Sequence, residues 1–197
     1  LNGKGVVQDA EIAVEWYERA ADLDHVNAMR SLGLCIAQGL GTEKDMATAG
    51  DWMANAADKG CEQAQITLAR WCFLGEISFL DAQNIYKWFR AAAELGDSVA
   101  QCGLGGLYRN GTLIERDYDE AIKWLRLSAE QGCKFGLYEL GLCYMSGYGV
   151  EVNTEEGYRL YRLSSEQGYM RAQSSVGAVL YLGTVVIRNI KEAIYWF

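Results

Sequence analysis

The chain has 197 residues, half of them hydrophobic and 12% aromatic, with a formal net charge of −8. This apolar content excludes a disordered chain, and the negative charge argues against nucleic acid as a partner. No apolar run approaches the roughly 20 residues of a membrane span. The absence of proline fits an almost wholly helical chain.

One stretch recurs along the chain at a fixed interval. The segment DYDEAIKWLRLSAEQG begins at position 117, and related segments begin at positions 9, 45, 81, 153 and 189, so that each copy starts 36 residues after the last. A fixed period in this range is the signature of a stacked repeat. Because one unit cannot bury its apolar face alone, neighbouring units are expected to cover one another.

Each 36-residue unit divides into a first helix, helix A, and a second helix, helix B. The predicted elements are a lone helix B at 9–24, complete pairs at about 25–60, 61–96, 97–132 and 133–168, and a partial repeat at 169–197. The predicted fold class is therefore all-α, a single α/α superhelical solenoid over residues 1–197. The sequence opens in a loop without an initiator Met and stops inside a helix, so we expect a fragment of a longer protein.

Helix B has a recurring start and a recurring end. The residues predicted to cap its first turn are Asp9, Asp45, Asp81, Asp117, Asn153 and Asn189. Asp and Asn side chains accept hydrogen bonds from the free N–H groups there. Glu120, Glu156 and Glu192 follow three residues later and predict capping boxes. Glycines at 60, 96, 132 and 168 are expected to end the helix in a left-handed conformation. The tryptophans of helix B are expected to pack in the core.

Helix A carries a small residue, a leucine four residues later and then, in most units, a glycine, as in Ala28, Leu32 and Gly33. A spacing of four keeps such residues on one face. Glycine inside a helix costs about 1 kcal/mol relative to alanine, so its recurrence predicts a close contact between helices. A second glycine is expected to end helix A at positions 39, 75, 111, 147 and 183.

These features resemble the Sel1-like repeat family, a relative of the tetratricopeptide repeat. The pattern Ala-x3-Leu-Gly-x2-Tyr-x2-Gly is clearest from Gly136 to Gly147, and Gly-x-Gly-Val follows at 147–150. The resemblance covers essentially the whole chain, although the Tyr is replaced in three units and the Gly-x-Gly-Val loop is degraded in two. It implies antiparallel helix pairs stacked into a right-handed superhelix, with a concave inner face formed by the A helices.

The cysteine spacing argues against disulfides. The six cysteines are Cys35, Cys61, Cys72, Cys102, Cys133 and Cys143. Cys61 and Cys72 lie in one predicted helix about 16 Å apart, too far for a disulfide, and Cys133 and Cys143 fail the same test. We expect small buried hydrophobes in a reducing compartment, with a disulfide scaffold as the alternative. The cytoplasm is favoured, and the periplasm stays open because the native N-terminus is not shown.

The sequence does not favour catalysis. His25 is the single histidine and has no repeated partner, so a capping or surface role is expected. Acid pairs such as Asp119 and Glu120 fall in first helical turns, where they complement the helix dipole. Phosphate-loop, dinucleotide-binding and serine-hydrolase motifs are missing, and the dispersed cysteines form no metal-ligand pattern. We predict a non-enzyme without a cofactor or metal.

A stripe of positions on helix A points away from the predicted core. At 100° per residue, five positions of the first helix A lie opposite Ala28, Leu32 and Ile36, and they recur in each unit. We call these 25 positions the A-helix stripe: 27, 30, 34, 37 and 38, and their equivalents at intervals of 36. None is Asp or Glu, although about three acids would be expected by chance.

The resemblance places this stripe in the concave groove, and its residue types suit a peptide ligand. Arginine pairs with carboxylates, and aromatic residues are common interface anchors. The predicted partner-binding residues are Arg30, Arg70, Phe73, Arg109, Asn110, Tyr138, Met145, Arg171 and Tyr181. The alternative is that packing between A helices buries the stripe, which would also exclude acids, or that a partner binds elsewhere.

The predicted function is a non-enzymatic protein–protein interaction adaptor or scaffold that holds a protein or peptide segment in its concave groove. The expected partner is acidic with apolar anchors. Two alternatives stay open. One, suggested by the resemblance, is a bacterial immunity or host-interaction protein that neutralises a secreted effector. The other is a structural spacer between flanking modules.

Overall fold

The computed structural model describes residues 9–77, 82–111 and 113–196, and within them it contains eleven α-helices and no strand. This confirms the predicted all-α fold class. The helices are α1 (Ala10–Asp22), α2 (Val26–Gln38), α3 (Met46–Asp58), α4 (Glu62–Leu74), α5 (Ala82–Glu94), α6 (Ser98–Asn110), α7 (Tyr118–Glu130), α8 (Lys134–Ser146), α9 (Thr154–Glu166), α10 (Met170–Leu182) and α11 (Ile190–Trp196).

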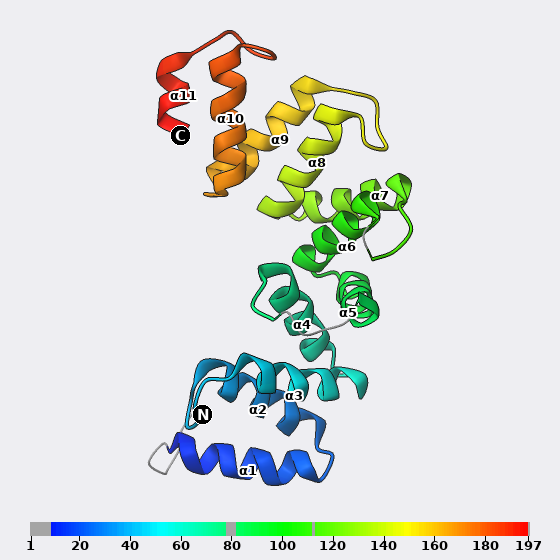
Figure 1. The fold of residues 1–197 in the computed structure, drawn as a ribbon, viewed down its shortest axis with the longest axis vertical. Helices are drawn as coiled ribbons and strands as arrows, with labels where there is room; N and C mark the ends of the chain where they lie inside the picture. Colours follow the sequence, from blue (N-terminus) through cyan, green and yellow to red (C-terminus); the bar gives the residue numbers. More distant parts are fainter. Residues whose placement is uncertain (1–8, 78–81, 112, 197) are drawn as a thin grey trace. The chain divides into compact units, whose positions relative to one another are not determined.

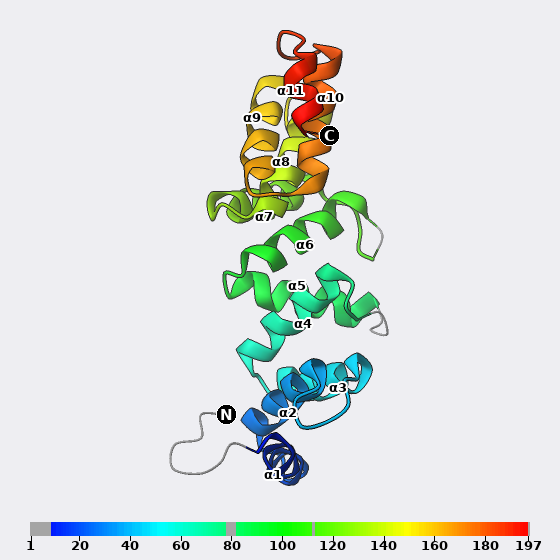
Figure 2. The ribbon, with the colours of Figure 1, turned by 90° about the vertical axis from the view of Figure 1, so that its left-hand side faces the viewer.

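The chain divides into two compact units, residues 1–95 (unit 1) and 96–197 (unit 2). Unit 1 holds α1 to α5, and unit 2 holds α6 to α11. Within each unit, helices that follow one another in sequence pack side by side (Figures 1 and 2). The even-numbered helices correspond to helix A and the odd-numbered helices to helix B. A single uninterrupted solenoid across both units stays a prediction.

The predicted caps of helix B are confirmed wherever the structure describes them. Asp45 Oδ1 accepts hydrogen bonds from the backbone N–H groups of Ala47 and Thr48 at 2.9 and 3.3 Å. Asp117 accepts two equivalent bonds at 3.0 Å, and Asp9 and Asn153 accept one each. Asn189 caps α11 in the same way, at 3.2 Å from the N–H of Glu192. The predicted cap at position 81 lies outside the described residues.

The predicted capping boxes are wrong. In a capping box, the backbone N–H of the cap residue donates to the side chain of the glutamate. Here that N–H donates instead to a carbonyl nine residues earlier, in the preceding helix A. Asp117 donates to Tyr108 at 3.0 Å, and Asn153 donates to Tyr144 at 2.9 Å. The glutamates take other partners: Glu120, for example, accepts from Lys123 Nζ and from the indole N–H of Trp124. This carbonyl bond ties each loop to its own helix A.

Replacing Asp117 by Ala should lower the free energy of unfolding of unit 2 by about 1 kcal/mol, because two N–H groups of the first turn of α7 lose their acceptor. Native-state hydrogen exchange of the α7 amides measures this loss. Asp117→Asn is the matched control, since Asn fills the same place at positions 153 and 189. An equal loss in both variants would contradict the capping role.

The glycines that end the helices adopt the predicted left-handed conformation. All nine predicted helix-ending glycines have φ between 65° and 91°. Asp24 occupies the corresponding place after α1, with φ 66°, and is the one non-glycine residue of positive φ in the described chain. Its carboxylate also pairs with Lys59 Nζ at 3.1 Å. The left-handed backbone conformation therefore favours glycine at these ends.

The glycines inside helix A confirm the predicted close contacts. A Cβ atom on Gly33 would meet the carbonyl oxygen of Ala49 at 3.0 Å, and one on Gly141 would meet Tyr161 Cδ1 at 2.9 Å. In both cases the neighbour belongs to the helix B that follows. The leucines predicted to face the core are buried with them, as Leu32 shows. Glycine thus lets the two helices of a pair approach closely.

The prediction that the helix B tryptophans pack in the core is confirmed for Trp88 and for Trp196, which packs against the core around Tyr161, and it is wrong for Trp16. Trp88 is 1% exposed, but Trp16 is 62% exposed. Trp52, Trp124 and Trp196 are half-buried. Trp16 lies on α1, the first helix in the described chain, which packs against α2 on its other side. A residue's place in the repeat therefore decides burial only where another helix covers it.

All six cysteines are free thiols, which confirms the reading of their spacing. Cys35, Cys102 and Cys143 are buried, as expected, whereas the other three are half-buried. Burial raises the pKa of Cys143 to about 11 and that of Cys102 well above its usual value. These thiols therefore stay protonated and act as small apolar residues.

Candidate protein-binding surface

Every predicted partner-binding residue keeps some solvent exposure. Arg70, Asn110, Arg171 and Tyr181 are exposed, and the other five are half-buried. Residues on the opposite side of the same helices, such as Leu104, are fully buried. The stripe also contains buried members, Ala37 and Cys102 among them. Its large and charged side chains thus reach the surface while some small ones pack between helices.

Unit 1 carries the stripe on α2 and α4. A cleft of about 430 Å³ lies beside it. Its lining residues are Leu34, Ala37 and Gln38 of the stripe, with Lys44, Met46, Trp71 and Glu76. Arg30, Arg70 and Phe73 are not among the lining residues. The cleft therefore joins part of the stripe to the loops that follow helix A.

Unit 2 places an acidic residue against the stripe, which the sequence analysis did not anticipate. Arg109 Nη2 on α6 lies 2.8 Å from Glu139 Oε2 on α8, and the two side chains are only 15% and 17% exposed. Glu139 is not one of the 25 stripe positions, but it forms an ion pair with Arg109, which was predicted to bind the ligand. Arg109 Nε has no hydrogen-bond partner among the described residues.

The electrostatic environment of Glu139 is unusual for a carboxylate in an ion pair. Loss of water around the side chain raises the pKa of Glu139, although the positive charges of Arg109 and Arg171 both oppose the rise. Desolvation therefore outweighs the attraction of two guanidinium groups. The same finding places Arg171 of α10 close enough to Glu139 for their charges to interact, so α6, α8 and α10 contribute to one charged cluster.

Aromatic rings lie next to this cluster. Tyr138 meets Tyr169 edge to face, with ring centroids 5.2 Å apart, and Tyr169 meets Phe135 in the same way. Tyr138 also stacks on the buried Tyr161. Tyr138 and Met145 pack against the core around Tyr161. These two predicted binding residues therefore have a structural role as well.

Two arginines near the stripe were missed because they lie in loops. Arg116 and Arg188 hold the same place in the repeat, just before a helix B cap, and each lies over a tyrosine ring. The ring under Arg188 is that of Tyr181, a predicted site residue that is 49% exposed. The recurrence of Arg at intervals of 72 residues could have revealed this position.

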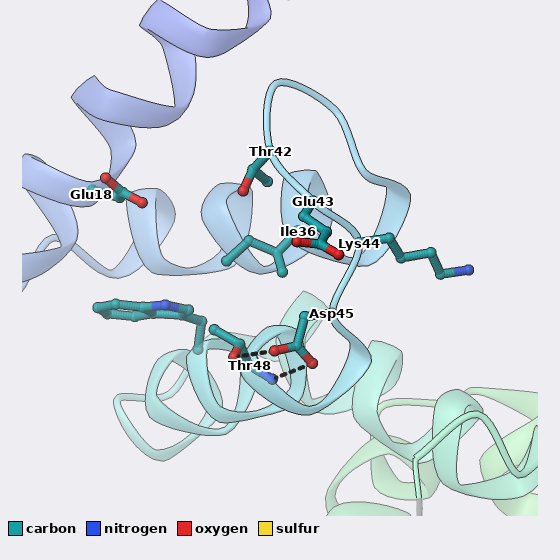
Figure 3. Close-up of a pocket in the computed structure, with 8 residues that line it drawn as sticks. Glu18, Ile36, Thr42, Glu43, Lys44, Asp45 and Thr48 are labelled. Carbon is teal, nitrogen blue, oxygen red and sulfur yellow. Dashed lines mark hydrogen bonds between the residues drawn. The ribbon is translucent and has the colours of Figure 1, made fainter.

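A further cleft, of about 500 Å³, lies between α1, α2 and α3 in unit 1 (Figure 3). Glu18 and Ile36 line it together with the loop from Thr42 to Asp45. Asp45 accepts a hydrogen bond from Thr48 Oγ1 at 2.6 Å, and hydrogen bonds from the side chain and backbone of Thr48 lower the pKa of Asp45. The bonds drawn in Figure 3 therefore serve the start of α3.

The part of the chain that the structure describes shows no metal-binding cluster and no membrane-spanning helix. No three His, Cys, Asp or Glu side chains gather there in a way that could hold a metal ion. None of the described helices is both long enough and apolar enough to cross a bilayer. His25 is exposed, and its side chain forms no cap hydrogen bond at the start of α2.

The model of the Sel1 repeat matches residues 1–25, 26–61, 63–97, 98–133, 135–169 and 171–197. The chain belongs to the Sel1 repeat family. Sel1 repeats generally mediate protein interactions, and the members of the family are generally non-enzymatic scaffolds. A comparison with curated proteins finds no match to this chain.

Solved structures of other Sel1 repeat proteins share the fold. A Sel1 repeat protein from Oxalobacter formigenes is 27% identical, with a TM-score of 0.79 over 98% of this chain and 78% of its own. The protective antigen c5321 of uropathogenic Escherichia coli is 31% identical, with a TM-score of 0.74 over 99% of this chain and 42% of its own. The immunity protein PA5088 from Pseudomonas aeruginosa is 21% identical, with a TM-score of 0.59 over 100% of this chain and 74% of its own.

Proposed function

We propose that this Sel1 repeat chain is a non-enzymatic adaptor that holds a segment of a partner protein along the A-helix stripe. The observation that carries the proposal is that four of the nine predicted binding side chains are exposed and the other five are half-buried, on helices whose opposite sides are buried. A surface that served packing alone would have its aromatic and arginine side chains enclosed. The membership of the chain in the Sel1 family supports the same role.

The partner segment is proposed to be acidic with apolar anchors. Arg171 is exposed on α10 and Arg30 is half-buried on α2, and neither has a carboxylate partner among the ion pairs of the described residues. Because arginine binds carboxylates through paired hydrogen bonds, an acidic segment would complement these charges. Tyr181 offers an exposed ring as an apolar contact. Arg109 is expected to contribute less to binding of the acidic segment, because its charge is already neutralised by Glu139.

A selection from a phage-displayed random peptide library against the 197-residue chain tests the proposal. The expected peptides combine Asp or Glu with large apolar residues. Their affinity, measured by fluorescence anisotropy, should fall at least about tenfold in Arg171→Glu, because an attractive charged contact becomes repulsive. Arg171 is the better target than Arg109, because Arg109 is in direct contact with Glu139 and its reversal would place two carboxylates side by side.

The matched control is Arg126→Glu, which makes the same charge change at an exposed position of α7, on a helix B. Its affinity for the selected peptides should equal that of the unchanged chain, and both variants should keep the helical circular-dichroism signal. Selection of peptides without acids, or equal losses in both variants, would refute the stripe as the binding surface. A structural spacer would select no peptide.

The neutralisation of a secreted effector is a special case of the same proposal. The immunity protein PA5088 shares the fold at 21% identity, which supports the architecture without indicating the partner. An effector would have to present an acidic and apolar segment to the stripe. The peptide selection therefore also tests this case, because it shows whether the stripe binds acidic and apolar segments.

A further inference from the structure

A small cavity in unit 2 lies where the stripe meets two loops. Its volume is about 280 Å³, and its lining residues are Arg109, Asn110, Arg116, Tyr118 and Tyr148. Arg109 and Asn110 are the last stripe residues of α6, whereas Arg116 and Tyr148 come from the loops before α7 and α9. The volume is at the small end for ligand sites, roughly 300 Å³ and above, so it suits one side chain or chain terminus.

The walls of this cavity are held in place by packing. The rings of Tyr118 and Tyr148 stack with centroids 5.8 Å apart and an interplanar angle of 12°. Gly149 follows with φ 69°, and a Cβ atom there would lie 2.8 Å from the carbonyl oxygen of Tyr118. Glycine at this position therefore lets the α8–α9 loop sit directly against the start of α7.

The cavity is positively charged and open to solvent, because Asn110, Arg116 and Tyr148 are exposed. None of its five lining residues is acidic, although the chain carries a net charge of −8. Within the described residues, Arg116 donates two long hydrogen bonds, to the hydroxyl of Tyr118 at 3.4 Å and to the carbonyl of Asn110 at 3.5 Å, and its guanidinium lies over the Tyr118 ring. Bonds of this length are weak. Arg109 is paired with Glu139 on one side, but its Nε has no partner among the described residues.

We propose that this cavity binds a carboxylate of a peptide lying on the A-helix stripe, with Arg116 as its main ligand. The proposal rests on the proposed function and names the chemistry that anchors the partner. The exposed planar guanidinium of Arg116 can exchange its two long hydrogen bonds for a paired interaction with a carboxylate. The carboxylate comes either from an Asp or Glu side chain or from the C-terminus of the peptide.

Three synthetic peptides test the proposal by nuclear magnetic resonance on the full 197-residue chain. The first is acetyl-Ala-Leu-Glu-Phe-Ala-amide, the second has Gln in place of Glu, and the third is the Gln peptide with a free C-terminal carboxylate. We expect the Arg116 Nε–H signal to shift with the first or third peptide and not with the second. The first identifies a side-chain carboxylate and the third a C-terminal one, and either supports the proposal.

Variants of the chain complete the test. Arg116→Gln should raise the Kd of the carboxylate peptide about tenfold, as expected for loss of a charged hydrogen-bonding partner. Arg126→Gln removes the same charge from α7 outside the cavity and should leave the Kd unchanged. Equal shifts with the neutral peptide, no shift with either carboxylate peptide, or an unchanged Kd in Arg116→Gln would overturn the proposal. Tighter Arg116-dependent binding of inorganic phosphate would overturn the choice of carboxylate.

The two proposals can fail separately. If Arg171→Glu weakens the library-selected peptides and Arg116→Gln does not, the stripe remains as the binding surface and the carboxylate cavity is refuted. If the carboxylate peptides bind through Arg116 while the library yields no peptide, the cavity remains and the adaptor function is refuted.

Discussion

Replacement of Arg109 by Met, or of Glu139 by Leu, is expected to lower the free energy of unfolding of unit 2 by about 3 kcal/mol in each case. The side chains are 15% and 17% exposed and approach to 2.8 Å. Each single replacement leaves the opposite charge largely out of water without its ion-pair partner. A double replacement by Met and Leu removes both charges together and is expected to restore the stability to within about 1 kcal/mol.

The raised pKa of Glu139 is the reason to expect this recovery. Desolvation of the Glu139 carboxylate outweighs the attraction of Arg109 and Arg171, so the charged form of Glu139 is less favourable here than in water. Apolar side chains of similar size avoid the cost of burying a charge. The pair is therefore held in place by the surrounding fold and contributes little net stability of its own.

Native-state hydrogen exchange of the α6 and α8 amides measures the four free energies of this double-mutant cycle. A coupling energy near zero would contradict the buried pair, as would a Glu139→Leu variant as stable as the unchanged chain. The double variant is also useful for the peptide experiments. It keeps the shape of the surface while removing the Arg109 charge from the proposed carboxylate cavity.

Local features of the fold could be predicted from the sequence because they depend on neighbouring residues alone. The caps at Asp45 and Asp117 satisfy N–H groups within three residues. The glycines that end the helices are favoured by the backbone angle at one residue. The capping boxes failed because a competitor for the same N–H group, the carbonyl of Tyr108 in the case of Asp117, comes from the preceding helix.

The surface could be predicted less completely, because side-chain contacts between helices, both within a repeat and between repeats, do not follow the 36-residue period. Arg109 and Glu139 are 30 residues apart. The same offset joins Ser128 to the carbonyl of Ser98, and Arg162 to Glu192. A search of the sequence for opposite charges 30 residues apart would have found the partner of Arg109. The exposure of Trp16 could not be foreseen, since it depends on which helix covers α1.

Adjacent glycines in α6 are expected to respond in opposite directions to the same substitution. Gly105→Ala should lower the free energy of unfolding of unit 2 by about 1–2 kcal/mol, because overpacking outweighs the gain in helix propensity. A Cβ atom there would lie 2.8 Å from Leu125 Cγ and 3.1 Å from the carbonyl oxygen of Ala121. A Cβ atom at Gly106 would meet nothing within 4 Å. Gly106→Ala should therefore raise the free energy of unfolding of unit 2 by up to about 1 kcal/mol.

The sign of the Gly105 effect depends on whether α7 can move away. Leu125 Cγ is not the flexible end of its side chain, and the second contact is backbone, so neither yields without a shift of the helix. Ala69 fills the corresponding place in α4 and is fully buried there, so the pair of α4 and α5 already accommodates a Cβ. The reciprocal Ala69→Gly should therefore destabilise unit 1 by at least about 1 kcal/mol. Hydrogen exchange of the α4 and α6 amides measures both substitutions, and equal responses at Gly105 and Gly106 would show that helix spacing does not select glycine.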